Sequence, residues 1–451
     1  MSASWARRLA VILGLCLLCR PTDARNGVAA ASLCAGRHDV VFSPHGDTLS
    51  RTKVAAVACA TEGVRDLTAR QPITVRLVDA ADLRSEAALI RKRDVAAESL
   101  DATSRALVLL GALSPDQSLS QIRSSQYSGN TTAQYDIHSK ILYVRVDAPA
   151  YTPLDRALIS HEFTLALLDQ HFNLSTLVGP HKDAGGWNFD AQLAAEALVE
   201  GDAYTTMLNF AATTFSRQDL VLFNQQLQRP SNPPPDFAHD QIGFPAAQGT
   251  NFVRAIMQAA AKGKHGDAAA QAANKALDTA MQHPPTSTSE ILNPAQYMQH
   301  STSPAAAETV DPLDLGPQWT EVDSDVMGAF GISDLLSQNG TKSTGTQAAA
   351  LAGSTWQSDR WVVYKDGAAS LMVWKAHFTT VEGAQAFVHA LSSYTAARYH
   401  ASLADKAPLS WHTKGYAIAV RANGTQVAVA MSSNAQSLDL LIQGLVLLGF
   451  S

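Results

Sequence analysis

The spacing of apolar and polar positions differs between the two parts of the chain. Up to about residue 300, apolar residues recur mainly at helical spacing, and two alternating runs, 73–79 and 133–147, predict a strand and a hairpin. The predicted helices cover residues 52–68, 80–111, 154–172, 188–215 and 249–282. This order indicates a mainly helical domain with a small sheet.

Beyond about residue 315 the alternating pattern dominates. The runs "DRWVVYKDG" and "ASLMVWKAHF" form one predicted hairpin, and "WHTKGYAIAVRANG" and "TQVAVAMSS" form another. Asp366-Gly367 and Asn423-Gly424 are strong hairpin-turn pairs. Helix-like segments follow at 380–403 and 435–449, so the pattern predicts a ββαββα module. Its aromatic set, Trp356, Trp361 and Trp374, is expected in the sheet core rather than in a ligand cage.

The composition of several segments indicates where the domains begin and end. Arg7 and Arg8 precede a short apolar run and the polar "RPTDARN", which is typical of a signal peptide cleaved after Ala24. The proline-rich segment 229–237 is a surface connection, and the Ser-, Ala- and Pro-rich segment 301–315 is a predicted linker. We therefore expect a signal peptide (1–24), a first domain (25–300), a linker (301–315) and a C-terminal module (316–451), in an exported α+β protein.

Overall composition narrows the function classes. Of 451 residues, 46% are hydrophobic and 16% charged, as in a well-packed globular protein, and the net charge of −6 comes without a long basic run. This argues against nucleic acid as a partner, and no segment after the signal is long enough to span a membrane. Cys34 and Cys59 remain in the mature chain. They either form a disulfide or are two buried thiols.

The segment "HEFTLALLDQHF" carries the clearest chemical signal. In the pattern H-E-x-x-H, two histidines one helical turn apart bind zinc, and the glutamate after the first activates water. His161 and Glu162 match the first two positions. The second histidine would fall at position 165, which is Leu165.

A third ligand is predicted on the next long helix. The motif "ALVEGDA" places Glu200 thirty-nine residues after His161, and Glu196 lies one turn earlier on the same face. Asp202 is expected to be a charge on the helix surface, or else a partner of a metal ligand. The C-terminal end of the predicted helix 154–172 is expected to be held to its surroundings by three polar residues, Asp169, Gln170 and His171.

These motifs, in this order, resemble an exported bacterial family of gluzincin-type zinc metallopeptidases. "HEFTLALLDQHFNL", "ALVEGDA", "FPAAQGTNFV" and "PPTSTSEILNPAQY" match in sequence, and the resemblance extends to "WQSDRWVVYKDG". It implies a mainly helical gluzincin-like domain, zinc as cofactor, metal binding by His161 and Glu200, and Glu162 as catalytic base. Leu165 departs from the pattern and leaves two protein ligands where three are usual.

Two interpretations of this departure stay open. The favoured one is a peptidase homologue with an incomplete zinc site, catalytically impaired, that binds a peptide or another protein. The alternative is an active zinc peptidase that uses a substitute ligand. His171 lies ten residues from His161 on the same helix and points away, whereas His181, in "GPHKDAGG", lies on a segment that can fold back.

Overall fold

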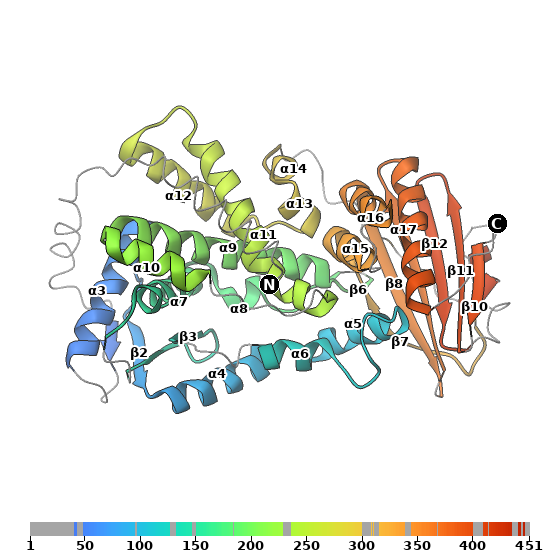
Figure 1. Cartoon of the computed structure of the whole chain (residues 1–451), viewed down its shortest axis with the longest axis horizontal. Coiled ribbons are helices and arrows are strands. Elements are labelled where there is room, and N and C mark those ends of the chain that lie inside the picture. The colour runs from blue at the N-terminus through green and yellow to red at the C-terminus, as the bar shows by residue number, and fades with distance from the viewer. Residues whose placement is uncertain are drawn as a thin grey trace.

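The computed structural model describes residues 40–42, 48–94, 97–126, 132–146, 150–183, 185–228, 236–299, 308, 310, 315–338, 344–367, 369–399, 409–413, 415–434, 441–442 and 445–446. The expected signal peptide, Cys34 and most of the expected linker lie outside these residues. The described chain is α+β. A helical body lies between a small sheet and a larger C-terminal sheet (Figure 1).

The small sheet is formed early in the chain. Its strand order is β1-β2-β4-β3, with β1, β2 and β4 parallel and β3 antiparallel to β4 at the edge. The strands are β1 (Val40–Phe42), β2 (Ile73–Val78), β3 (Ala133–Asp136) and β4 (Ile141–Arg145), and the helices around them are α3 (Thr48–Arg65), α4 (Ala80–Asp94), α5 (Ala97–Leu109) and α6 (Leu119–Gln126). Cys59 on α3 is disulfide-bonded, to a partner outside the described residues, so it is not a free thiol.

The helical body is built around one long central helix, α9 (Phe189–Thr214), which packs against α7 (Pro153–Phe172) and α11 (Phe237–Ala261). The remaining elements of this part are α8 (Leu174–Leu177), the hairpin β5 (Lys182–Asp183) and β6 (Gly186–Trp187), α10 (Arg217–Leu227), α12 (Gly266–Gln282), α13 (Thr288–Leu292) and α14 (Pro294–Gln299). Almost the whole circumference of α9 is buried, which is why its apolar residues show no single stripe.

The start of α11 differs from the prediction. The helix begins at Phe237, with Asp236 as its N-cap, twelve residues before the predicted start, and Pro245 lies inside it. Proline removes one backbone hydrogen bond from a helix interior. Here Pro245 is buried beside Phe244 in the contact with neighbouring helices, so tertiary packing outweighs the local preference.

The C-terminal sheet has six antiparallel strands in the order β10-β11-β12-β9-β8-β7. Its elements are β7 (Thr320–Asp325), α15 (Gly328–Ser337), α16 (Thr344–Thr355), β8 (Trp356–Asp366), β9 (Ala369–Phe378), α17 (Val381–Tyr399), β10 (Leu409–Thr413), β11 (Tyr416–Asn423) and β12 (Gln426–Ser432). Gly367 and Gly424 adopt positive φ in the two predicted hairpin turns. Helices α15, α16 and α17 cover the face toward the helical body (Figure 1).

The ββαββα prediction for this module is incomplete. Strand β7 and helices α15 and α16 precede the first hairpin, and the second hairpin has an additional strand because its first run divides into β10 and β11. β7 was missed because "TEVDSD" is too polar to predict a strand. Of the predicted helix 435–449, residues 441–442 and 445–446 are described, and Leu441 and Leu445 pack on the outer face of the sheet.

One apolar core runs through the whole described chain. It contains Phe163 of α7 and Leu198 of α9 together with Trp374 of β9 and Phe387 of α17. Within the expected linker, Glu308 pairs with Lys375 on the C-terminal sheet. None of the described helices combines the length and apolar character that a membrane span needs.

Candidate functional site

Helix α7 holds the His-Glu pair in a well-defined position. Thr152 and Asp155 form a reciprocal capping box, and Pro153 occupies the first turn, where its missing N–H is not needed. Asn173 ends the helix in the left-handed conformation, with its N–H donating to the Asp169 carbonyl. Both ends of the twenty-residue helix are therefore fixed.

The C-terminal end of α7 is tied to its surroundings by the three polar residues predicted to do so. The Asp169 carboxylate accepts hydrogen bonds from the Tyr135 hydroxyl and the Leu174 N–H, and pairs with Lys140 at 2.6 Å. Gln170 bonds to the backbone at 70–71, and His171 Nε2 lies 2.8 Å from the Thr68 carbonyl. His171 thus contacts the backbone at Thr68 and not the His161 site.

The two motifs meet where α7 crosses α9. His161 Nε2 lies 3.2 Å from Glu200 Oε2, and His161 Nδ1 lies 3.4 Å from Glu162 Oε1. The His161 side chain is 8% exposed and that of Glu200 34%. The structure thus brings together all three residues that the sequence selected, with the imidazole between two carboxylates.

The electrostatic surroundings favour a charged His161. Burial disfavours the imidazolium and lowers its pKa, but the interactions with Glu162 and Glu200 outweigh burial and raise the pKa to about 10. The ring of Tyr204, one turn after Glu200, contacts the imidazole edge-on, with the centroids 4.6 Å apart. These surroundings predict that His161 is protonated at neutral pH.

Glu162 is held by the edge strand of the small sheet. Its Oε2 accepts a hydrogen bond of 2.8 Å from the Tyr135 N–H on β3, while Oε1 faces His161. The carboxylate position is thus fixed by the backbone of a neighbouring element. Sequence reasoning missed both Tyr135 and Tyr204, although Tyr204 follows Glu200 at helical spacing.

Leu165 occupies the position of the missing ligand. It lies one turn after His161 on α7, which places it on the same side of the helix, and it packs, partly buried, against the apolar core. Its side chain offers no atom that can ligate a metal or donate a hydrogen bond. Position 165, where the H-E-x-x-H pattern has its second histidine, thus holds a hydrocarbon side chain.

The spacing of His161 and Glu200 can be compared with that of two ligands on one zinc ion. Two ligand atoms on one tetrahedral zinc lie about 3.3 Å apart, because each is about 2.0–2.1 Å from the ion. The spacing of 3.2 Å between His161 Nε2 and Glu200 Oε2 suits such a pair, and Nε2 is buried without an aligned hydrogen-bond partner. Among the described residues, however, no group of three His, Cys, Asp or Glu is arranged to hold a metal. A complete three-ligand site does not fit these residues.

His181, the other substitute considered, is engaged locally. Its Nδ1 lies 2.8 Å from the Gly179 carbonyl, next to the short β5–β6 hairpin. That hairpin is itself held by Arg360, which pairs with Asp183. His181 thus has a local partner within its own loop.

The prediction that Asp202 is a helix-surface charge is wrong. Asp202 is fully buried and accepts two hydrogen bonds from Arg65 Nε, at 2.9 and 3.0 Å, and both side chains are 0% exposed. Arg65 Nη2 also pairs with Asp278 at 2.7 Å. Residue 202 lies on α9, whose circumference is almost entirely covered, and sequence spacing alone did not reveal this.

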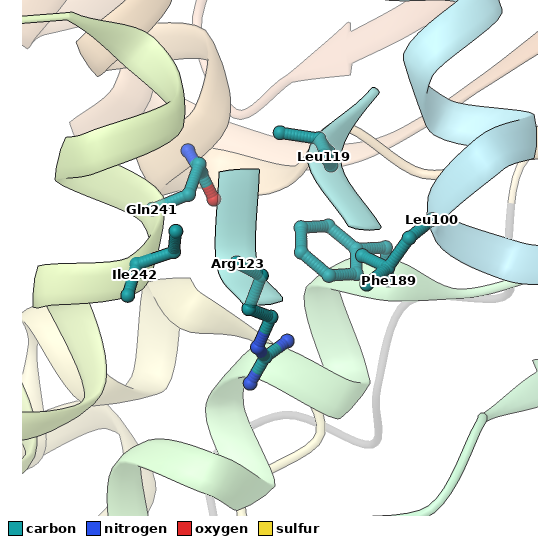
Figure 2. A pocket seen from close by; sticks show the side chains of 6 residues that line it. All are labelled: Leu100, Leu119, Arg123, Phe189, Gln241 and Ile242. Carbon is teal, nitrogen blue, oxygen red and sulfur yellow. The ribbon is translucent and has the colours of Figure 1, made fainter. Parts of the chain in front are cut away.

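Glu196 is directed into a separate polar contact. It accepts hydrogen bonds from Gln192 Nε2 at 3.0 Å and from Arg123 Nη2 at 2.5 Å. Arg123 and Gln241 line a small pocket whose other walls are apolar (Figure 2). The apolar walls are Leu100, Leu119, Phe189 and Ile242. The enclosed space holds about one water molecule.

Comparison with known proteins matches one part of the chain. A family model described as a domain of unknown function (DUF8575) matches residues 315–441, which contain β7 to β12. No curated protein and no solved structure matches the chain. The matched segment includes neither α7 nor α9, so the family description says nothing of the His161 site.

Proposed function

We propose that the protein is an exported homologue of gluzincin-type metallopeptidases in which an ion pair stands where the catalytic zinc would be bound. In this proposal it binds a peptide or protein segment and does not hydrolyse it. The observation that carries the proposal is the direct approach of His161 Nε2 to Glu200 Oε2, at 3.2 Å, with Leu165 one turn further along α7.

The charge on His161 supports this interpretation. A metal binds the neutral imidazole, so an incoming ion must first displace a proton that two carboxylates stabilise. It would then gain two protein ligands where zinc sites use three or four. Both effects weaken zinc binding relative to a complete site.

The position of Glu162 fits the same proposal. As a general base, a glutamate needs an acidified water to deprotonate, and the metal supplies that water in zinc peptidases. Glu162 instead faces the imidazolium at 3.4 Å and accepts the Tyr135 N–H. It contributes to holding the charged histidine.

One observation favours the alternative, an active zinc peptidase. His161 Nε2 is buried and makes no aligned hydrogen bond, although Glu200 is near enough for one. A nitrogen in this state is also what a metal ligand looks like before the metal arrives. Active hydrolysis then requires a further ligand from outside the three residues.

Metal content separates the two functions. Wild type, Leu165→His and Leu165→Gln are purified identically, dialysed against equimolar zinc and analysed for bound metal, with circular dichroism as a check of folding. The proposal expects substoichiometric zinc in wild type and in Leu165→Gln, and occupancy near one per chain in Leu165→His. The Gln variant controls for polarity without adding a good zinc ligand. Stoichiometric zinc in wild type overturns the proposal in favour of an active peptidase.

A further inference from the structure

Three buried carboxylates meet where the N-terminus of α9 contacts the C-terminal module. Asp190 lies in the first turn of α9, Asp325 ends β7, and Asp359 lies on β8. They are 2%, 0% and 1% exposed. We call this group the aspartate joint. It lies at the N-terminal end of α9, about three helical turns before Glu200, and is independent of the peptidase proposal.

Two of the three carboxylates accept several hydrogen bonds across the joint. Asp359 accepts from the N–H groups of Met327 and Gly328, at the start of α15, and from the indole N–H groups of Trp356 and Trp374. Four donors satisfy an ionised carboxylate well. Trp361 and Trp374 are fully buried, as predicted for the sheet core, whereas Trp356 at the start of β8 is partly buried against the same core.

Asp325 links the module directly to α9. It accepts hydrogen bonds from the N–H groups of Phe189 and Val326, both at 2.7 Å, and from the Thr103 hydroxyl at 2.5 Å. The Phe189 N–H is one of the donors that the first turn of α9 leaves unpaired. Asp325 is thus also satisfied as an anion.

Asp190 has fewer donors than its two neighbours. Both of its bonds come from Thr288 on α13, one from the N–H at 3.1 Å and one involving the hydroxyl. The Thr288 hydroxyl oxygen also accepts from the Phe330 N–H on α15. The Asp190 carboxylate approaches the Cα of Gly328 so closely that a Cβ there would overlap it, so Asp190 lies next to the Gly328 N–H that Asp359 binds.

Among the described residues, no Lys, Arg or His side chain forms an ion pair with a carboxylate of the aspartate joint. The hydrogen-bond donors to all three carboxylates are neutral N–H and O–H groups. The buried cation nearby is Arg360, which is committed to Asp183 at 2.5 and 2.6 Å and to the Trp187 and Glu308 carbonyls. Other charged groups on the adjoining elements include Arg105 paired with Asp323, Glu290 of α13 and Asp334 of α15.

We propose that Asp190 is a proton-binding residue that controls how firmly the C-terminal module docks on the helical body. With Asp190 protonated, the joint holds at most two carboxylate charges, those of Asp325 and Asp359, and each of these carboxylates has several donors. When Asp190 releases its proton to solvent, a third negative charge appears among buried groups without a direct cation. Repulsion then weakens the hydrogen bonds that join α9, α13 and α15.

The pKa values of these carboxyl groups are shifted in the direction that this geometry predicts. Burial raises the pKa of Asp190 to about 8; the bonds from Thr288 oppose this rise, and the charges of Asp359 and Asp325 add to it. Burial raises the pKa of Asp325 to about 7. A carboxyl whose folded pKa lies above its unfolded value loses stabilisation as pH rises from the unfolded pKa to the folded one. The module should therefore dock more firmly at mildly acidic than at mildly alkaline pH.

Hydrogen exchange on the full chain tests this proposal. The amides of Phe189, Met327 and Gly328 donate to Asp325 and Asp359, so their protection reports on the joint. After correction for intrinsic exchange, wild-type protection should fall between about pH 6 and about pH 8, by up to about tenfold per pH unit for one proton. Asp190→Asn should make this fall clearly smaller, because its side chain cannot ionise and only the contribution of Asp325 remains. Asp219→Asn, which removes a partly exposed carboxylate on α10 that pairs with Arg156 far from the joint, should behave as wild type.

A second measurement covers the case in which Asp190→Asn does not fold. Infrared spectra of wild type should show a carboxylic acid C=O band that disappears as pH rises through about 8. In Thr288→Val, which removes a bond that lowers the pKa of Asp190, the band should persist to higher pH. Unchanged pH dependence in a folded Asp190→Asn, or no carboxylic acid band at neutral pH in wild type, overturns the proposal.

Discussion

His161 Nε2 on α7 lies 3.2 Å from Glu200 Oε2 on α9. This contact joins two sequence motifs whose residues are thirty-nine positions apart. The imidazole is enclosed between Glu200 and Glu162, with Tyr204 against its edge. The interaction between these groups depends on the charge of the imidazole, which makes the protonation state of His161 the first property to measure.

We predict that His161 remains protonated well above neutral pH. Its pKa of about 10 lies above the unfolded value near 6.5, so its stabilisation is complete below about pH 6.5 and is lost as pH rises through about 10. Glu200→Gln removes one neighbouring charge and should lower the pKa by about 1–3 units. Imidazole NMR resonances followed against pH measure both values.

The matched control for that titration is Glu382→Gln, which removes an exposed carboxylate in the first turn of α17. It should leave the His161 titration unchanged. A wild-type His161 that titrates near 6.5 would show that the carboxylates do not hold it as a cation, and the ion-pair interpretation of the site would fail.

A second prediction concerns chemistry in the repaired site. If Leu165→His acquires peptidase activity towards unstructured protein substrates, Glu162→Gln in the same chain should reduce it by at least about a hundredfold, because general-base catalysis contributes roughly 10²–10⁴. Zinc content should be equal in both. A chelator should remove the activity, and zinc should restore it. Activity that survives Glu162→Gln would mean that another residue is the base.

Local pattern was sufficient for much of the fold. The boundaries of α7 and α9 and the turns at Gly367 and Gly424 follow from helical spacing, capping residues and turn pairs, all of which act within a few residues. The start of α11 did not follow, because Pro245 is tolerated only through packing against other helices.

In the site, too, local sequence predicted some features and missed those that depend on tertiary packing. Motif spacing selected His161, Glu162 and Glu200, since helix geometry fixes where such residues point. It did not reveal that Arg65, 137 positions earlier, pairs with Asp202, or that the Tyr135 N–H holds Glu162. These partners come from distant segments, and no local signal in one sequence identifies them.

A third prediction follows from the buried pair of Arg65 and Asp202. Removing one partner of a fully buried ion pair leaves an uncompensated charge, so Asp202→Asn should lower the free energy of unfolding by about 3–5 kcal/mol. Asp278→Asn removes the partly exposed partner of the same guanidinium and should cost much less, about 1 kcal/mol. Urea denaturation of the two variants compares them. Equal losses would show that Asp202 has no special role in holding α3 against α9.

The last prediction explains the glycine of the "ALVEGDA" motif through the contact between α9 and α11. A Cβ on Gly201 would overlap the backbone of Gly249, and a Cβ on Gly249 would overlap the Ala197 carbonyl, so the two helix backbones touch at this crossing. Backbone atoms cannot yield as a flexible side chain can. Gly249→Ala should therefore destabilise the protein by about 1–3 kcal/mol or more, because the helices must separate. Gly243→Ala lies on the same helix, where an added Cβ meets nothing within 4 Å, and it should be neutral or stabilising by up to about 1 kcal/mol through helix propensity. Thermal unfolding of the two variants measures the difference. Because Gly201 lies next to Glu200, separation of α9 from α11 should also displace Glu200 from His161, so Gly249→Ala should lower the pKa of His161 whereas Gly243→Ala should leave it unchanged.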